Sequence, residues 1–185
     1  MNDPKKTTVI SDVEMIYKHG DCKYAIWNYI PRGFWIQPFK DWFPDIYSYN
    51  ATDFNYSVCF TMYLNLSPTK YQIGTKEFRN YVITNGVLDL LLADISVVAP
   101  YAVVKYLQYR FIDNNTKLFD SYTPFKPVHA KYGNKLKRHL QDRCITCLED
   151  DILFAKVDDE ISLENRTKDV RVYNCLFDDS DTWPK

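Results

Sequence analysis

Apolar side chains occupy every second position of the stretch from Asp53 to Leu64. They alternate with mostly polar residues, and they are Phe54, Tyr56, Val58, Phe60, Met62 and Leu64. Successive side chains of a strand point to opposite faces of a sheet, so this period of two predicts one long, half-buried strand. The six apolar side chains are expected on its buried face.

A second extended run, rich in Tyr, Val and Phe, covers Tyr101–Ile112. The Asp and Asn residues of the segment 113–116 tolerate turn dihedrals, and Leu118 and Phe119 can start a returning strand, so a hairpin is predicted. Weaker strands are predicted at Tyr24–Ile30, Tyr81–Ile83, Ile152–Val157 and Val170–Phe177.

Helical patterns are few and short. Thr84 or Asn85 can cap a helix in which four apolar residues share one face, namely Val87, Leu88, Leu91 and Leu92. Further helices are predicted over Asn134–Asp142 and over Ser11–Lys18, where Ser11 and Glu14 have the spacing of a capping box. The proline- and aromatic-rich segment Pro31–Pro44 is interpreted as a loop or edge whose rings close one end of the core.

These elements predict an α+β fold with an antiparallel or mixed sheet and a few short helices. A chain of 185 residues, 46% of them hydrophobic and 25% charged, fits one globular domain over residues 1–185, with residues 1–10 as a disordered tail. The polar start of the chain has no apolar signal region, and the odd number of cysteines, 5, favours reduced thiols. A cytoplasmic location is therefore expected.

Charge is segregated in the C-terminal half. The segment from Lys126 to Arg143 carries six basic residues and one acid, Asp142. From Glu149 to Asp181, eleven acids oppose four bases, which leaves a local charge of −7 in a chain whose net charge is −1. Such a segment makes a strongly negative surface if its acids converge in the fold.

Candidate catalytic and metal-binding groups are sparse. Cys144 and Cys147 have the spacing of a zinc or redox pair that His139 and Cys175 would have to complete, but a second clear ligand pair is missing, so buried or half-buried thiols and no metal are expected. His129 and His139 flank the basic run, which permits a two-histidine nuclease, although two surface histidines are the favoured interpretation. Glycine-rich phosphate loops are absent. No cofactor and no enzymatic activity are expected.

Two stretches, Tyr81–Leu91 and Pro100–Ile112, together resemble immunity proteins of bacterial polymorphic-toxin and contact-dependent inhibition systems. In that family a short strand ending in Ser or Thr is followed by a brief helix and then by an aromatic-rich strand. The resemblance covers about 30 residues. It implies a cytoplasmic protein that binds and blocks one toxin domain, often a nuclease, without catalysing a reaction.

The charge pattern is compatible with such an inhibitor, because nuclease toxins hold phosphates in basic clefts that a carboxylate-rich surface can mask. The partner-binding residues predicted on this basis are Glu149, Asp150, Asp151, Asp158, Asp159 and Glu160. The alternative is a nucleic-acid-binding protein that contacts phosphates through Lys126–Arg143, and an enzyme with an unrecognised site is the third possibility. The net charge of −1 opposes the nucleic-acid alternative.

Overall fold

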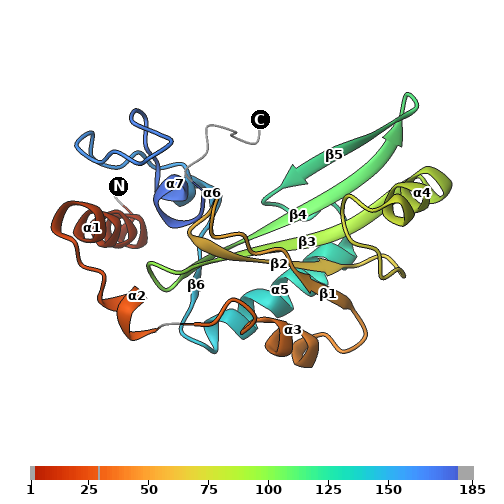
Figure 1. The fold of residues 1–185 in the computed structure, drawn as a ribbon, viewed down its shortest axis with the longest axis horizontal. Coiled ribbons are helices and arrows are strands. Elements are labelled where there is room, and N and C mark those ends of the chain that lie inside the picture. Colours follow the sequence, from red (N-terminus) through yellow and green to blue (C-terminus); the bar gives the residue numbers. More distant parts are fainter. Residues whose placement is uncertain (1–2, 29, 179–185) are drawn as a thin grey trace.

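The computed structural model describes residues 3–28 and 30–178 and has a six-stranded sheet at its centre (Figure 1). The strands are β1 (Tyr47–Asn50), β2 (Cys59–Asn65), β3 (Val87–Ser96), β4 (Tyr101–Ile112), β5 (Asn115–Ser121) and β6 (Thr146–Cys147). Strands β1 to β5 are antiparallel neighbours in chain order, and β6 pairs with β4 in parallel, with Thr146 opposite Tyr101. The predicted α+β fold with a mixed sheet is confirmed.

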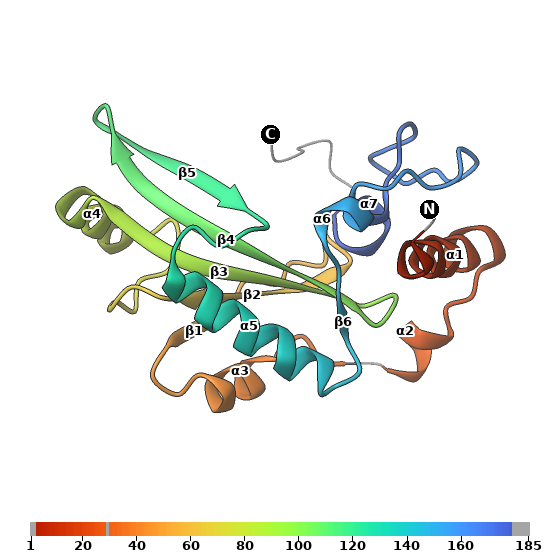
Figure 2. The same cartoon turned by 180° about the vertical axis from the view of Figure 1, so that it is seen from behind.

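Helices cover both faces of the sheet. They are α1 (Pro4–His19), α2 (Lys23–Trp27), α3 (Ile36–Trp42), α4 (Lys76–Asn85), α5 (Pro127–Gln141), α6 (Asp150–Leu153) and α7 (Val172–Leu176). Seen from behind, α5 lies along one face with α3 next to it (Figure 2). Helices α1, α6 and α7 gather at the end of the sheet where β3 turns into β4, and α4 lies at the opposite end (Figure 1).

Strand β3 is the clearest departure from the sequence prediction, which placed a helix over Val87–Leu92. Gly86 has a φ of 79° and ends α4, and Val87 then starts a strand that pairs with β2 on one side and β4 on the other. A central strand buried on both faces has a nearly continuous apolar sequence, which lacks the period of two and is easily confused with a helix.

Four predicted weak strands are also wrong, because each falls on or beside a helix. Residues 81–83 belong to α4, which begins after Thr75, whose hydroxyl accepts a hydrogen bond from the Phe78 N–H. The run predicted over residues 24–30 contains α2, with residue 29 outside the described residues. The runs over 152–157 and 170–177 contain α6 and α7, apart from an isolated bridge between Lys156 and Arg171.

The predicted hairpin is confirmed. Strand β4 covers Tyr101–Ile112, and the two residues that follow it have left-handed φ values, 53° for Asp113 and 62° for Asn114. A two-residue loop with positive φ at both positions matches the right-handed twist of paired strands. The chain therefore returns at once as β5, from Asn115.

Two predicted helices exist and are longer than expected. Helix α5 begins at Pro127, seven residues before the predicted Asn134. Helix α1 begins at Pro4 and not at Ser11, with the Asp3 carboxylate accepting a hydrogen bond from the Lys5 N–H at its N-terminus. Residues 4–10 are thus helical, where a disordered tail was predicted.

The aromatic segment at residues 31–44 closes the core beneath the sheet, as predicted, although it forms helix α3 over part of its length. Trp35, Phe39 and Phe43 are buried against the strands and α5. None of the helices in the described ranges combines the length and the apolar character needed to cross a bilayer.

The long alternating run is a strand only in its second half. Strand β2 begins at Cys59, and Phe60, Met62 and Leu64 are buried as predicted. Phe54 and Tyr56, assigned to the same buried face, are instead 45% and 76% exposed. They lie in a turn in which the Asp53 carbonyl accepts hydrogen bonds from the N–H groups of Tyr56 and Ser57.

Candidate partner-binding surface

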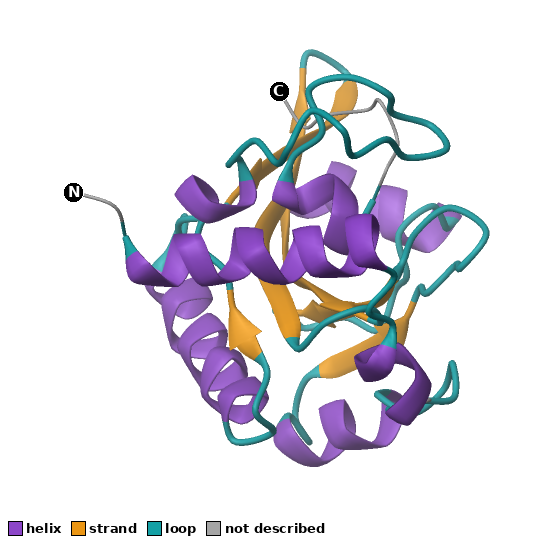
Figure 3. Ribbon diagram, turned by 90° about the vertical axis from the view of Figure 1, so that its left-hand side faces the viewer, coloured by secondary structure: helices purple, strands orange, loops and turns teal. Residues whose placement is uncertain are grey.

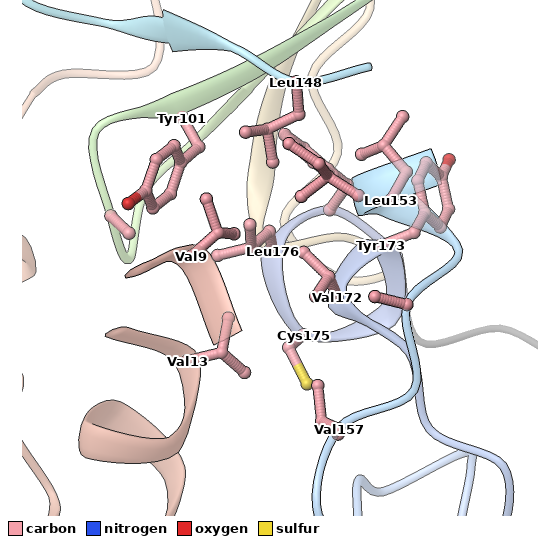
Figure 4. Close-up of a cluster of buried hydrophobic side chains, with 14 of the residues drawn as sticks. Val9, Val13, Tyr101, Leu148, Leu153, Val157, Val172, Tyr173, Cys175 and Leu176 are labelled. Carbon is pink, nitrogen blue, oxygen red and sulfur yellow. The ribbon is translucent and has the colours of Figure 1, made fainter. Parts of the chain in front are cut away.

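Helix α1 organises the end of the molecule that carries the predicted acidic site. Val9 and Val13 of α1 point toward Val172 and Leu176 of α7 in a buried cluster (Figure 4). Tyr17 donates a hydrogen bond of 2.6 Å to the carbonyl of Cys175. Since α1 is joined to the core by these contacts, groups attached to it are held in fixed positions.

The first acidic triplet, Glu149, Asp150 and Asp151, lies at the start of α6 and is exposed. Lys6 of α1 donates a hydrogen bond of 3.1 Å to the backbone carbonyl of Asp151. Glu149 pairs with Lys137 of α5 at 3.3 Å and keeps 56% of its side chain exposed. The triplet therefore lies beside the N-terminal end of α1.

The second triplet lies beside the C-terminal end of α1. Lys18 contacts the Asp158 carboxylate at 2.6 Å and the Glu160 carboxylate at 3.1 Å, and Lys156 contacts Asp159 at 2.7 Å. The hydrogen bond from Lys18 and the backbone N–H of Glu160 hold the pKa of Asp158 below its usual range. About 80% of the side chains of Asp159 and Glu160 is exposed.

The six predicted acids thus lie beside the two ends of α1, at the end of the molecule that faces the viewer in Figure 3. Lys6 and Lys18 are twelve residues apart, which is about 18 Å along a helix axis. A protein interface of standard size covers about 800 Å² on each partner, so one partner can contact both triplets. Four of the six carboxylates are paired with lysines of this chain, a feature that the sequence pattern did not predict.

The basic segment Lys126–Arg143 forms α5, and much of its charge is already engaged. Lys126 pairs with Asp89 at 2.8 Å, and Lys135 donates to the carbonyl of Trp42 at 2.5 Å. The guanidinium of Arg143 lies 5.3 Å from the Trp42 ring centroid. These contacts leave Lys131 and Arg138 as the more exposed cations of α5, so few of its charges are open to a phosphate backbone.

The two histidines of α5 do not form an acid–base pair. They are ten residues apart, about 15 Å along the helix. His129 is fully buried, contrary to its predicted surface position, with its Nε2 3.3 Å from Asp89. His139 stacks on Trp42 with ring centroids 4.9 Å apart, and burial followed by the charge of Lys135 lowers its pKa. The two imidazole rings therefore cannot act together on one substrate.

Cys144 and Cys147 lie in different environments. Cys144 is exposed with a φ of 59°, and Cys147 is half-buried in β6, where burial raises the pKa of its thiol to about 11. Cys175 lies in the cluster beneath α1. Across residues 3–28 and 30–178 there is no group of three or more His, Cys, Asp or Glu side chains placed to hold a metal ion.

A buried polar cluster that the sequence pattern did not predict lies under α7. Lys105 of β4 donates a 2.8 Å hydrogen bond to the hydroxyl of Tyr173 and lies 3.8 Å from Asp94 of β3. Thr61 donates to Asp94 at 2.9 Å. Burial raises the pKa of Asp94, and the charge of Lys105 opposes this shift. Because these groups are enclosed, they stabilise the fold and are not accessible to a substrate.

No family model matches the chain, and searches of the curated proteins and of the solved structures found no significant match.

Proposed function

We propose that this chain is a cytoplasmic immunity protein that binds and neutralises a basic toxin domain, such as a nuclease, without catalysing a reaction. The observation that carries the proposal is the position of both acidic triplets beside α1, at one end of the molecule. Of the pattern that residues 81–91 and 100–112 share with this class of protein, the aromatic-rich strand β4 is present, whereas the strand and the helix before it are reversed, so the proposal rests on the acidic surface.

The physical mechanism is electrostatic masking. A nuclease must present cationic groups to bind phosphates, so a carboxylate-rich surface is complementary to its substrate cleft. Clustered charge also raises the rate of encounter at low ionic strength. The lysine pairs described above hold the carboxylates in place, so ordering them on binding costs little entropy.

The alternative function, nucleic-acid binding through α5, has weaker support. Lys126, Lys135 and Lys137 all contact groups of this chain, and the net charge of −1 does not favour a polyanion. Purification provides a simple distinction. A chain that binds nucleic acid retains it and shows a raised ratio of absorbance at 260 nm to that at 280 nm, whereas the proposed immunity protein does not.

The direct test uses the toxin domain encoded by the gene immediately upstream, since immunity genes usually follow their toxin genes. The triple variant Asp158→Lys/Asp159→Lys/Glu160→Lys should associate with this domain at least about tenfold more slowly at low salt. The difference should become small at about 1 M salt, where the Debye length is about 3 Å. Stopped-flow association rates at both salt concentrations measure the effect.

A matched control changes the same amount of charge at the other end of the molecule. The variant Glu77→Lys/Asp113→Lys/Asp120→Lys alters α4 and the β4–β5 hairpin and has the same net charge as the test variant. If both triple variants slow association equally, net charge and not the α1 surface is responsible. If the wild-type chain neither binds the domain nor protects a bacterial host from it, the proposed function is wrong.

A further inference from the structure

The turn at residues 53–58 presents large apolar side chains to solvent. Tyr56 is 76% exposed and Phe54 is 45% exposed, and Ile26 of the adjacent α2 is 70% exposed. Large exposed hydrophobic groups scattered singly need no explanation, but several at one place indicate an interaction surface. Phe54 and Tyr56 lie beside Tyr17 of α1 and the loop that follows the second acidic triplet, because these groups line one hollow.

The turn is rigid. The Asp53 carboxylate accepts hydrogen bonds from the backbone N–H and the side-chain amide of Asn55, at 3.1 and 2.9 Å. At the other end of the turn, Val58 donates its N–H to the carbonyl of Phe177 and accepts from the N–H of Val97, both at 3.0 Å. A preorganised loop loses little conformational entropy when it binds, so its side chains can contribute most of their contact energy.

A hollow lies on each side of this turn. The first, of about 340 Å³, is mainly apolar and is lined by Phe54, Val58, Phe60 and Val97 together with α2. The second, of about 330 Å³, lies between Tyr56 and the loop that follows the second acidic triplet, where Leu163 and Glu164 line it. Each is near the lower limit, about 300 Å³, of the pockets that bind small ligands. A single large side chain fits such a space.

The charges near the second hollow indicate what kind of partner residue can bind there. Glu164 lines the second hollow, and Tyr17, which lines it as well, precedes Lys18, the partner of Asp158 and Glu160. An apolar anchor flanked by cationic residues would match the apolar hollow and these carboxylates together. Protein interfaces are typically built in this way, with a few aromatic anchors at the centre and a charged rim around them.

We propose that the Phe54–Tyr56 turn is the anchor site of the partner interface, and that its two hollows take a large apolar side chain and a neighbouring arginine or lysine from a basic protein segment. This inference rests on the proposed function and adds to it the location of the tightest contacts. Tyr56 sets the lifetime of the complex, and the acidic triplets set the rate of encounter.

The first experiment needs no toxin. A lysine- and arginine-rich peptide with a central tryptophan is titrated into the ¹⁵N-labelled chain and followed by NMR. The expected result is a set of shifts in the amide resonances of residues 54–58, 97 and 163–164, with affinity at least about tenfold higher than for the same peptide with a central glycine. Equal affinity of the two peptides, or equal binding of a glutamate-rich peptide with the same tryptophan, overturns the proposal.

The second experiment uses Tyr56→Ala with Tyr71→Ala as its matched control, because Tyr71 is also exposed but lies in the loop between β2 and α4. Because both side chains are exposed, each substitution should leave the melting temperature within about 2 °C of that of the wild type. We expect Tyr56→Ala to weaken binding of the upstream-encoded domain about 30-fold, mainly by faster dissociation, and Tyr71→Ala to have no effect.

The outcomes separate this inference from the proposed function. A wild-type chain that binds the toxin domain while Tyr56→Ala binds equally well refutes the anchor site and leaves the immunity function intact. If the wild-type chain does not bind the toxin domain, the proposed function is refuted. The peptide titration then tests the anchor site by itself. If the turn is instead covered by a second copy of this chain, sedimentation shows a dimer that Tyr56→Ala dissociates, which also refutes the inference.

Discussion

Replacing Lys105 with methionine tests how much the fold depends on its buried charges. The Lys105 side chain is 7% exposed, and its ammonium group is 2.8 Å from the Tyr173 hydroxyl and 3.8 Å from the Asp94 carboxylate. Methionine has a similar length and fills the same space. The substitution therefore removes the cation and leaves the Asp94 carboxylate without its counter-charge.

The magnitude follows from this geometry. Two unit charges at 3.8 Å interact by about 4 kcal/mol at an effective dielectric constant of about 20. Breaking a buried ion pair by removing one partner typically costs about 3–5 kcal/mol. We expect Lys105→Met to lower the free energy of unfolding by about 3–4 kcal/mol, and the melting temperature by roughly 6–16 °C.

The loss should depend on pH in a definite direction. Burial already raises the pKa of Asp94 above 3.8, and removal of Lys105 raises it further. Between its unfolded and folded pKa values the folded state then binds more protons, so the free energy of unfolding falls as pH rises through this interval. The variant should consequently lie closer to the wild type at about pH 4 than at about pH 8.

Urea denaturation followed by circular dichroism at both pH values measures these differences. Adding Asp94→Asn to Lys105→Met should recover about half of the loss at pH 8, because a neutral amide needs no counter-charge and still accepts the hydrogen bond from Thr61. A cost below about 1 kcal/mol for Lys105→Met, independent of pH, would show that the pair carries little of the stability.

Two further predictions concern the face covered by α5. Burial alone would raise the pKa of Asp89, but the contact with His129 and the hydrogen bonds from Lys126 and Gln108 lower it well below its usual range. Asp89→Asn should therefore cost about 2–3 kcal/mol at pH 7, and its difference from the wild type in urea denaturation should shrink as pH falls below about 4. An added Cβ at Gly133 would lie 2.7 Å from Cε1 of Tyr106, which is buried, so Gly133→Ala should cost about 1–3 kcal/mol in thermal melts. The control variant Asn134→Ala, at the exposed neighbouring position, should not lower the melting temperature.

The parts of the fold that were predictable from the sequence have local causes. The strand over Tyr101–Ile112 and its hairpin follow from β-forming residues and from two residues, Asp113 and Asn114, that tolerate left-handed φ values. Helix α5 follows from its spacing of apolar residues. The burial of Trp35, Phe39 and Phe43 follows from their size.

The wrong assignments come from tertiary effects that a local pattern does not contain. Strand β3 has neighbours on both sides, so its sequence lost the alternation that identifies a strand. The short helices α6 and α7 overlap the apolar runs at 152–157 and 170–177, and their buried residues join Val9 and Val13 of α1 in one cluster. The alternation extends upstream of Cys59, although residues 53–58 form a turn before the strand begins, and the exposure of Tyr56 was missed for that reason.

The candidate site was predictable as a set of residues but not as a surface. The six acids stand out by charge alone, whereas their common position depends on α1, which begins more than 120 residues before them in the chain. Asp53, Asn55 and Ser57 are turn-forming residues, and they were the available sign that Phe54 and Tyr56 leave the strand.

The lysine pairs within the acidic surface affect long-range steering and short-range ion pairing differently. Over the segment 149–171, eight acids oppose four bases, which leaves −4, and the three acids of residues 3–19 are balanced by the three lysines there. A distant partner responds to this remaining net charge, so steering persists although most of the triplet carboxylates are paired. At contact, a cation from the partner must share carboxylates with Lys18 or Lys156, which limits the gain from each new ion pair. Tight binding must then come from side chains that are not already paired within this chain. The exposed ring of Tyr56 is such a side chain.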